Sequence, residues 1–198
     1  AFGRLFNLPA KRFASIFSKA DEAIGIGGMS EGCRVIVREF GIDLEVSGVE
    51  NIPTSGPAII VSNHPGAYDS VSIGSLVKRT DLKIIAWQTQ VYRAMPNADQ
   101  QFLYTSESTS ARMLVIRQAI EHLLKGGIIL QFGSGLIEPD PAIMPGTEKS
   151  LKDWSPSIEI MLRKAPQSRL IQTVVSGVLL KRFAKHPLTK LVRGGVNQ

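Results

Sequence analysis

The chain contains a single cysteine, Cys33, among its 198 residues. A disulfide within the chain is therefore excluded, and a reducing compartment is indicated. No local motif supports Cys33 as a nucleophile, so we expect it to be a small buried apolar residue. Long hydrophobic runs are also absent, and none approaches the ~18 residues that a membrane-spanning helix needs. The chain is therefore not expected to cross a membrane.

Acidic residues are missing from both ends of the chain. Residues 1–20 hold four basic side chains and residues 160–198 hold eight, so all 17 acidic residues lie between them. Two basic ends on an acidic body indicate an anionic partner, either phospholipid or nucleic acid, although solvated tails would look the same. The basic C-terminal tail has one aromatic residue, Phe183, and no recognisable nucleic-acid module.

This charge pattern favours an anionic phospholipid surface as the partner and does not favour nucleic acid. We therefore expect a cytoplasmic protein that is peripheral on the inner face of the membrane. The sequence gives no indication of the oligomeric state.

Short apolar runs alternate with helical patterns through most of the chain. This order predicts a single α/β domain, residues 31–198, with a central mixed sheet flanked by helices. Expected strands cover residues 42–46, 58–61, 82–87, 102–104, 128–132 and 170–175, and expected helices cover residues 67–78, 108–125 and 155–164.

Residues 1–30 are expected to form an N-terminal amphipathic helical segment. Phenylalanines and other apolar residues recur there at roughly helical intervals with basic residues between them, which suits either a bilayer interface or packing on the body. Pro9 is expected to break or kink this segment. The glycines at positions 25, 27 and 28 are expected to form a linker.

The most informative residues follow the apolar run 58–61. Pro65 suits the first position of a helix, which leaves His64 at the strand-to-helix corner and Asp69 in the second turn. From there Asp69 can reach back to one ring nitrogen and fix the tautomer. The other nitrogen then faces the carboxyl-terminal edge of the sheet, where α/β proteins bind ligands.

This geometry suits a general base held by an orienting carboxylate. A helix-capping histidine near a surface aspartate is the alternative. His122 and His186 have no acid five residues further on, and they are interpreted as a helix-face residue and a tail residue.

A longer motif surrounds this pair. Residues 46–53 (Val-Ser-Gly-Val-Glu-Asn-Ile-Pro), residues 55–64 (Ser-Gly-Pro-Ala-Ile-Ile-Val-Ser-Asn-His) and Asp69 resemble the glycerolipid acyltransferases, the 1-acyl-glycerol-3-phosphate acyltransferase family, whose first motif is Asn-His-x4-Asp. The resemblance implies an acyltransferase-like fold. It also implies that His64 takes the proton of an acceptor hydroxyl, held by Asp69, and that Asn63 lies beside the substrate.

By the same resemblance, the hydroxyl attacks the thioester of acyl-CoA or acyl-carrier protein directly. No covalent enzyme intermediate, cofactor or metal is implied, and the thioester is a co-substrate. Two alternatives stay open: a thioesterase that uses water, and a family member that has lost catalysis and binds membrane or acyl chains.

The later motifs depart from the family pattern. The second motif ends its strand with Arg in the family, whereas this chain reads Phe-Leu-Tyr-Thr at residues 102–105. The third reads Phe-Pro-Glu-Gly-Thr-Arg in the family, whereas this chain reads Phe-Gly-Ser-Gly-Leu-Ile at residues 132–137. The missing Arg residues are those with which the family grips the acceptor phosphate, a bidentate task that Ile cannot perform.

Other residues are candidates for the lost contacts. The turn Gly133-Ser134-Gly135 could offer backbone N–H groups to an anion or an oxyanion, or it could be a plain turn. Glu138 is a candidate to replace the Glu of the family's third motif, where this chain has Ser134. A cation could come from Lys149, which lies in the long loop 133–153, or from Arg112 or Arg93.

Overall fold

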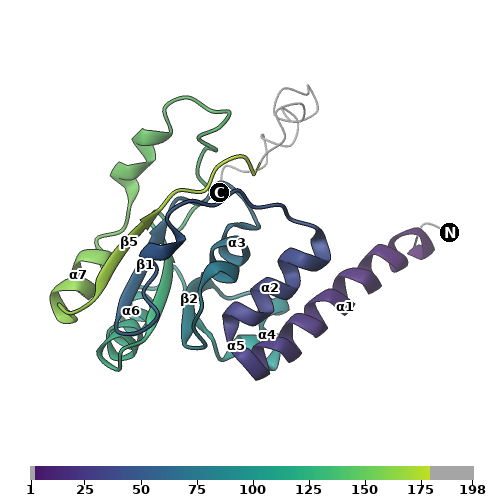
Figure 1. Cartoon of the computed structure of the whole chain (residues 1–198), viewed down its shortest axis with the longest axis horizontal. Coiled ribbons are helices and arrows are strands. Elements are labelled where there is room, and N and C mark those ends of the chain that lie inside the picture. The colour runs from purple at the N-terminus through teal and green to yellow at the C-terminus, as the bar shows by residue number, and fades with distance from the viewer. Residues whose placement is uncertain (1–2, 179–198) are drawn as a thin grey trace.

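The computed structural model describes residues 3–178 of the chain, and side chains from Pro9 onward (Figure 1). The basic C-terminal tail expected from the sequence, with Phe183 and His186, lies outside the described residues. So do the side chains of Phe2, Leu5 and Phe6 in the N-terminal segment.

A five-stranded sheet forms the centre of the molecule, in the order β3-β2-β4-β1-β5. The strands are β1 (Ala58–Ser62), β2 (Leu82–Trp87), β3 (Phe102–Thr105), β4 (Ile128–Phe132) and β5 (Arg169–Thr173). The α/β class is confirmed, but the expected mixed sheet is wrong, because all four strand pairings are parallel. Each connection between strands passes through helical structure, which returns the chain to the same end of the sheet.

Helices cover both faces of the sheet (Figure 1). On one side lie α1 (Gly3–Gly27), α2 (Met29–Phe40), α3 (Asp69–Leu76), α4 (Gln90–Arg93) and α5 (Pro96–Asp99), and on the other α6 (Thr109–Leu124) and α7 (Ser157–Lys164). Short 3-10 helices occupy Val49–Asn51 and Thr147–Asp153.

The core divides according to the alternation of side chains along the strands. Ile60 and Leu130 pack with residues of α1, α2, α3 and α5, whereas Ile59 and Ile129 pack with residues of α6 and α7. All five residues of β1 are buried. A parallel strand that is covered on both faces must be apolar throughout, which explains the continuous apolar runs in the sequence.

Three local expectations need correction. Residues 42–46 form no strand, because alternation shows only that an extended segment has two faces, and the described sheet provides no partner for them. The helix expected over 67–78 begins at Asp69, so Pro65 lies in the preceding loop and Asp69 in the first turn. α1 also continues through Pro9, since one missing N–H donor does not end a helix of 25 residues.

The glycines expected as a linker lie within helical structure. Gly25 and Gly27 belong to α1, and Gly28 joins α1 to α2 with φ at 75°. A Cβ on Gly28 would lie 2.1 Å from the carbonyl oxygen of Thr80. The turn therefore requires glycine, and it allows α2 to fold back beside α1.

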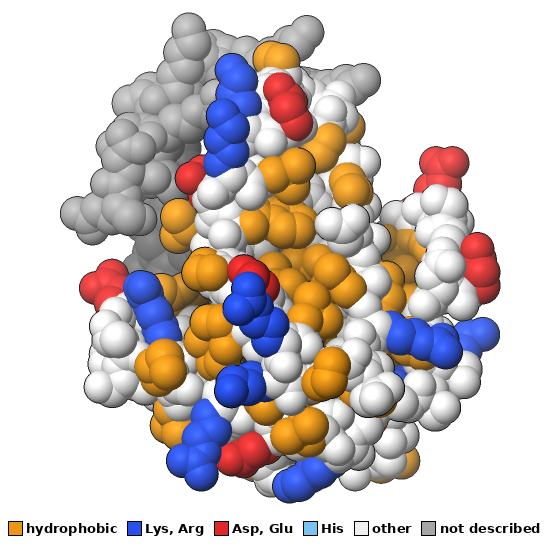
Figure 2. Space-filling model, turned by 90° about the vertical axis from the view of Figure 1, so that its left-hand side faces the viewer, with side chains coloured by type: hydrophobic (Ala, Val, Ile, Leu, Met, Phe, Trp, Pro, Cys, Tyr) orange, Lys and Arg blue, Asp and Glu red, His pale blue; other side chains and the backbone are white. Residues whose placement is uncertain are grey.

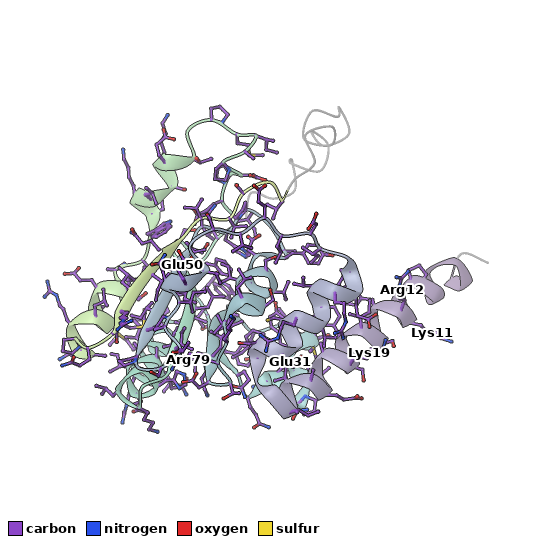
Figure 3. The ribbon with its side chains drawn as sticks, in the orientation of Figure 1. Lys11, Arg12, Lys19, Glu31, Glu50 and Arg79 are labelled. Atoms are coloured by element: carbon purple, nitrogen blue, oxygen red, sulfur yellow. The ribbon has the colours of Figure 1, made fainter. Side chains whose placement is uncertain are left out.

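The N-terminal helix α1 is attached to the body through its second half. Ile16, Ala20 and Ile24 are buried. Asp21 accepts hydrogen bonds from the backbone N–H groups of Asn97 and Ala98 at 3.0 and 2.8 Å, at the start of α5. In the first half of α1, by contrast, Lys11 and Arg12 are exposed (Figure 3). No helix in residues 3–178 is long and apolar enough to span a bilayer.

Arg79 holds together the loops at the edge of the sheet opposite the strands' carboxyl ends (Figure 3). Its guanidinium binds both carboxylate oxygens of Asp81, and it donates to the carbonyl oxygens of Gly56 and Gly126 at 2.6 Å each. Although burial alone would raise the pKa of Asp81, the hydrogen bonds and charge of Arg79 outweigh it and lower that pKa. Arg79 therefore connects the segments that enter β1, β2 and β4.

Substituting Arg79→Met should reduce the free energy of unfolding by about 2–4 kcal/mol, since it leaves two carbonyl oxygens and a carboxylate without their partner. Arg117→Met is the matched control, because the Arg117–Glu121 pair is exposed and worth under about 1 kcal/mol. Urea denaturation measures the free energy of unfolding of both variants. The Asp81 carboxylate contributes to that free energy above its unfolded pKa of about 3.9, and this contribution is lost as the pH falls below that value. Equal stability of the two variants would contradict this role of Arg79.

Candidate active site

The carboxyl ends of β1 and β4 lie side by side at one edge of the sheet. Ser62 is paired with Phe132 in the register, and the N–H of Gly133 donates to the carbonyl oxygen of Ser62 at 2.9 Å. After β1 the chain turns to α3 on one face, and after β4 it leads to α7 on the other. Connections that diverge between neighbouring strands leave a crevice, which is where α/β sheets bind ligands.

His64 and Asp69 form a hydrogen-bonded pair in this crevice. The ring Nδ1 of His64 lies 2.8 Å from Oδ2 of Asp69. Asp69 is fully buried, whereas the His64 side chain is 22% exposed. Because a carboxylate can only accept, the hydrogen is assigned to Nδ1, and in the neutral ring Nε2 then presents a lone pair. The reach of Asp69 back to the ring agrees with the spacing argument, although Asp69 lies one turn earlier in its helix than expected.

Asp69 is itself held in place. The backbone N–H of Gly66 donates to Asp69 Oδ2 at 2.8 Å, and Asp69 is the first residue of α3, where the helix dipole favours a negative charge. Its other oxygen, Oδ1, is buried and has no hydrogen-bond partner among the described residues. Among the described residues, the Asp69 carboxylate thus accepts hydrogen bonds from one imidazole and one backbone amide.

Three contacts fix the orientation of the His64 ring. Asp69 holds one edge, and the ring of Phe132 stacks on its face with centroids 4.0 Å apart and planes 16° from parallel. The N–H of Glu138 donates to the His64 carbonyl oxygen at 2.8 Å. Nε2 has no partner among the described residues, so it is available to a ligand. The sequence did not reveal the stacking, because it depends on the β1–β4 register.

A cavity of about 680 Å³ opens beside His64. It extends along the carboxyl ends of β4, β2 and β3 and is bounded by α6 and by the loop after β4. Its lining contains His64 and one other charged or basic side chain, Arg112, and no acid among the described residues. Much of the remaining wall is apolar and comes from Ile85, Trp87, Val115, Ile116, Leu136 and Ile137. A volume of this size can hold a ligand as large as a drug molecule.

The turn Gly133-Ser134-Gly135 lines the cavity beside His64. The N–H of Gly133 is used by Ser62, whereas those of Ser134 and Gly135 have no acceptor among the described residues. They are the N–H groups of the turn that an oxyanion could use. A Cβ on Gly133 would lie 2.1 Å from the ring of Trp154, so glycine is required where Trp154 covers the turn.

Glu138 supports this turn from behind. It is buried and does not line the cavity. Its carboxylate accepts from the hydroxyls of Ser134 at 2.7 Å and Ser150 at 2.9 Å. The structure therefore places Glu138 as a brace between the turn and the 3-10 helix Thr147–Asp153. Ser150 was not identified from the sequence, since no spacing connects it to the turn.

Asn63 also braces the site from outside the cavity. Its side-chain amide donates to the carbonyl oxygen of Val175 and accepts from the N–H of Val175, both at 2.8 Å. A side chain thus makes the pair of bonds that a strand residue would make, and it fastens the segment after β5 to the end of β1. Asn63 was expected to contact substrate, but its polar atoms are already used by the protein.

The three candidate cations occupy different environments. Lys149 is exposed on the 3-10 helix and does not line the cavity. Arg93 pairs with Asp99 at 2.9 Å and lies over the ring of Tyr104. Arg112 lines the cavity, as do Thr105 and Ile137, the two positions at which the sequence lacks Arg.

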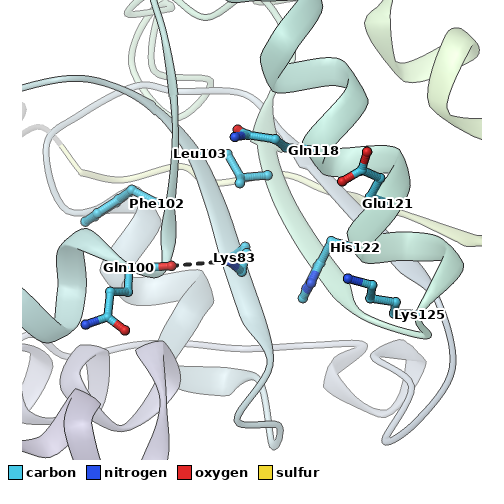
Figure 4. Close-up of a pocket in the computed structure, with 8 residues that line it drawn as sticks. All are labelled: Lys83, Gln100, Phe102, Leu103, Gln118, Glu121, His122 and Lys125. Carbon is cyan, nitrogen blue, oxygen red and sulfur yellow. Dashed lines mark hydrogen bonds between the residues drawn. The ribbon is translucent and has the colours of Figure 1, made fainter.

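A second hollow of about 340 Å³ lies at the opposite edge of the sheet and contains His122 (Figure 4). It is lined mainly by polar residues, and Lys83 Nζ donates there to the carbonyl oxygen of Gln100 at 3.2 Å. His122 Nε2 lies 2.7 Å from the carbonyl oxygen of Asp81, and burial lowers the His122 pKa. The His122 ring is hydrogen-bonded to a backbone carbonyl oxygen and not to a carboxylate, so it lacks the arrangement that distinguishes His64.

No three His, Cys, Asp or Glu side chains in the described residues are grouped as metal ligands. The chemistry available at the crevice is therefore that of an oriented base, a turn with two free N–H groups, and an apolar cavity with one cation. These groups suit the attack of a hydroxyl on a carbonyl carbon.

The family model described as Acyltransferase matches residues 43–152, which contain His64, Asp69 and the turn after β4. The match covers more than half of the chain. No curated protein matches the chain, and no solved structure matches it either.

Cys33 should not react with a thiol reagent until the protein unfolds. It is buried in the core against α3, and burial raises its pKa to about 12, so the reactive thiolate is scarce at neutral pH. Labelling with a chromogenic disulfide, with and without urea, measures this. Cys33→Ala should keep the wild-type rate of any reaction at the crevice. Rapid labelling of the native protein would contradict the assignment.

Proposed function

Because the chain belongs to the Acyltransferase family, we propose that it moves a fatty acyl group from a thioester donor, acyl-CoA or acyl-carrier protein, to a hydroxyl of a lipid-like acceptor. The observation that carries this proposal is the His64–Asp69 hydrogen bond beside a largely apolar cavity. The apolar part of the wall suits a fatty acyl chain, and the family match favours an acyl transfer.

The proposed reaction begins with the acceptor hydroxyl hydrogen-bonded to Nε2 of His64. As the hydroxyl oxygen attacks the thioester carbon, Nε2 takes its proton, and Asp69 stabilises the imidazolium that forms. The carbonyl oxygen becomes an oxyanion, and the N–H groups of Ser134 and Gly135, which line the cavity and have no acceptor among the described residues, are the proposed donors to it. The tetrahedral intermediate then expels the thiolate, which takes the proton from Nε2, and the ester remains.

His64→Ala should abolish acyl transfer while the protein still folds, although it should lower the stability, because it removes the ring stacked on Phe132 and one of the two donors to the buried Asp69 carboxylate. Asp69→Asn should reduce kcat by about 10²–10³, because an amide keeps the shape but loses the charge that stabilises the imidazolium. Release of free thiol from the donor measures the rate, and thermal unfolding checks the fold. His122→Ala is the control for loss of a histidine. A wild-type rate for His64→Ala would falsify the proposed base.

We further propose that the acceptor carries less negative charge than a phosphomonoester. Thr105 and Ile137 line the cavity at the positions where the family resemblance expects Arg, and Lys149 lies outside it. A doubly charged group brought to these side chains would lose charge-assisted hydrogen bonds worth roughly 1.5–3 kcal/mol each.

Glycerol-3-phosphate and lysophosphatidic acid should therefore be poor acceptors. Their kcat/KM should fall below that of a lysophospholipid with a substituted head group or of a neutral monoacylglycerol, by roughly two to four powers of ten if two such bonds are missing. Steady-state assays with one donor and this set of acceptors measure kcat/KM for each acceptor and test this prediction. The idea fails if lysophosphatidic acid gives the highest kcat/KM of the set.

Membrane contact is a separate proposal, and its support comes from charge. Lys11 and Arg12 are exposed on α1 next to Phe13, which is 46% exposed. The opposite side of the molecule, which carries α7 and β5 and lies away from Lys11 and Arg12 (Figure 3), also presents hydrophobic side chains with Lys and Arg side chains around them, and it is a second candidate surface (Figure 2). We propose that the protein binds an anionic phospholipid surface, where lipid substrates are found.

Sedimentation with vesicles that contain anionic lipid should remove the protein from solution at low salt, and binding should weaken as salt screens the charges. The double substitution Lys11→Gln, Arg12→Gln should weaken binding, because each base near the surface contributes about 1 kcal/mol. Arg117→Gln with Lys125→Gln, on α6 and just after it, is the charge-matched control. Absence of binding at low salt would exclude the membrane surface as a partner.

A further inference from the structure

One cation lies in a cavity that otherwise contains no fixed charge. Arg112, on α6, lines the same cavity as His64, and no other Lys or Arg and no acid of the described residues does so. Its Nε donates to the carbonyl oxygen of Ser106 at 3.1 Å. It forms no ion pair among the described residues, so its terminal nitrogens are available. A guanidinium held in this way can bind an anion.

The surroundings of Arg112 specify the charge of that anion. One guanidinium compensates one negative charge, and the neighbouring wall is formed by Val115, Ile116 and uncharged polar residues such as Thr105 and Ser106. Because Arg112 is exposed, a bound anion stays partly in water, and the balance of charge alone sets the match. A phosphodiester, with one negative charge, matches this single cation, whereas a phosphomonoester would bring a second charge that has no partner in the cavity.

Arg112 and His64 follow strands that are not adjacent. Arg112 stands beside the end of β3, and His64 follows β1, three strand positions away in the sheet. With strands about 4.8 Å apart, the two strand ends are separated by roughly 14 Å, and both side chains line the cavity between them. We therefore assign Arg112 to substrate binding and leave the proton transfer to His64.

We propose that Arg112 forms an anion subsite of the cavity and holds the phosphodiester of a substrate. The inference rests on the proposed acyl transfer. Two substrates could supply the group: the head group of a lysophospholipid acceptor, such as lysophosphatidylglycerol, or the phosphopantetheine arm of an acyl-carrier-protein donor. Both present the same singly charged phosphate, and kinetics separate them.

The test compares Arg112→Gln and Arg112→Lys with the wild type. Arg117→Gln is the matched control, because Arg117 lies on the same helix, is exposed, and does not line the cavity. KM and kcat are measured for lysophosphatidylglycerol and for a monoacylglycerol, each with acyl-CoA and with acyl-carrier protein as donor. Arg112→Gln should raise one KM by about 10- to 100-fold, with kcat little changed. Arg112→Lys should fall between it and the wild type.

If the acceptor supplies the phosphate, the KM for lysophosphatidylglycerol rises with both donors, while that for monoacylglycerol is unchanged. If the donor supplies it, the KM for acyl-carrier protein rises with both acceptors. Either result supports the subsite. Unchanged KM values in Arg112→Gln, or the same rise in Arg117→Gln, overturn it.

A direct binding measurement separates failure of the subsite from failure of the proposed reaction. Calorimetry with lysophosphatidylglycerol and with the isolated carrier-protein phosphopantetheine arm requires no turnover. If the wild type transfers no acyl group but Arg112→Gln weakens binding of one probe at least tenfold, the subsite stands and the proposed reaction falls. If the wild type binds neither probe, or if both proteins bind them equally, the subsite is wrong whatever the activity.

Discussion

The parallel pairing of β1 with β4 determines the geometry of the whole site. Five residues of each strand pair in register, from Ala58 opposite Ile128 to Ser62 opposite Phe132, and all of them except Phe132 are buried. This ladder places the segment after β1, with the histidine, beside the segment after β4, with the glycine turn and the stacked phenylalanine. A shift of one residue would turn every side chain of one strand to the other face. The core and the site therefore depend on the same register.

A second group of contacts keeps the loops at that edge in place. Glu138 and Asp140 are both buried, and each connects segments far apart in the sequence: Glu138 accepts from Ser134 and Ser150, and Asp140 accepts from the N–H groups of Ala142 and Gly177. Buried carboxylates are stable only when such donors surround them. Hydrogen bonds to Glu138 and Asp140 thus hold the long loop after β4 in place. Neither carboxylate lines the cavity, but both fix the loop that bounds it.

The sequence was most informative where contacts are local. The contact between His64 and Asp69 was predictable, because five residues and a strand-to-helix corner determine it. Most strands and helices of the body were predictable as well, since their apolar patterns reflect burial on a continuous sheet. The continuous apolar runs indicate strands that are covered on both faces, as parallel strands are, but a run does not identify the neighbours of a strand or their direction.

The remaining site residues depended on long-range packing. Nothing in the sequence distinguishes Lys149 from Arg112 as a cavity cation, because the answer depends on where the loop 133–153 is fastened. Asn63 and Glu138 were predicted to bind substrate, but whether a polar group faces the ligand or the protein depends on partners elsewhere in the sequence, such as Val175 and Ser150.

The His64–Asp69 pair and the cavity differ in how much of the chain builds them. His64 and Asp69 lie within one stretch of the chain, and their contact requires only that stretch and its strand. The walls of the cavity come from β2, β3, α6 and the loop after β4. Substitutions in those walls can therefore reshape the cavity while the hydrogen bond between His64 and Asp69 remains intact. The shape of the cavity and the geometry of the pair can thus be engineered separately.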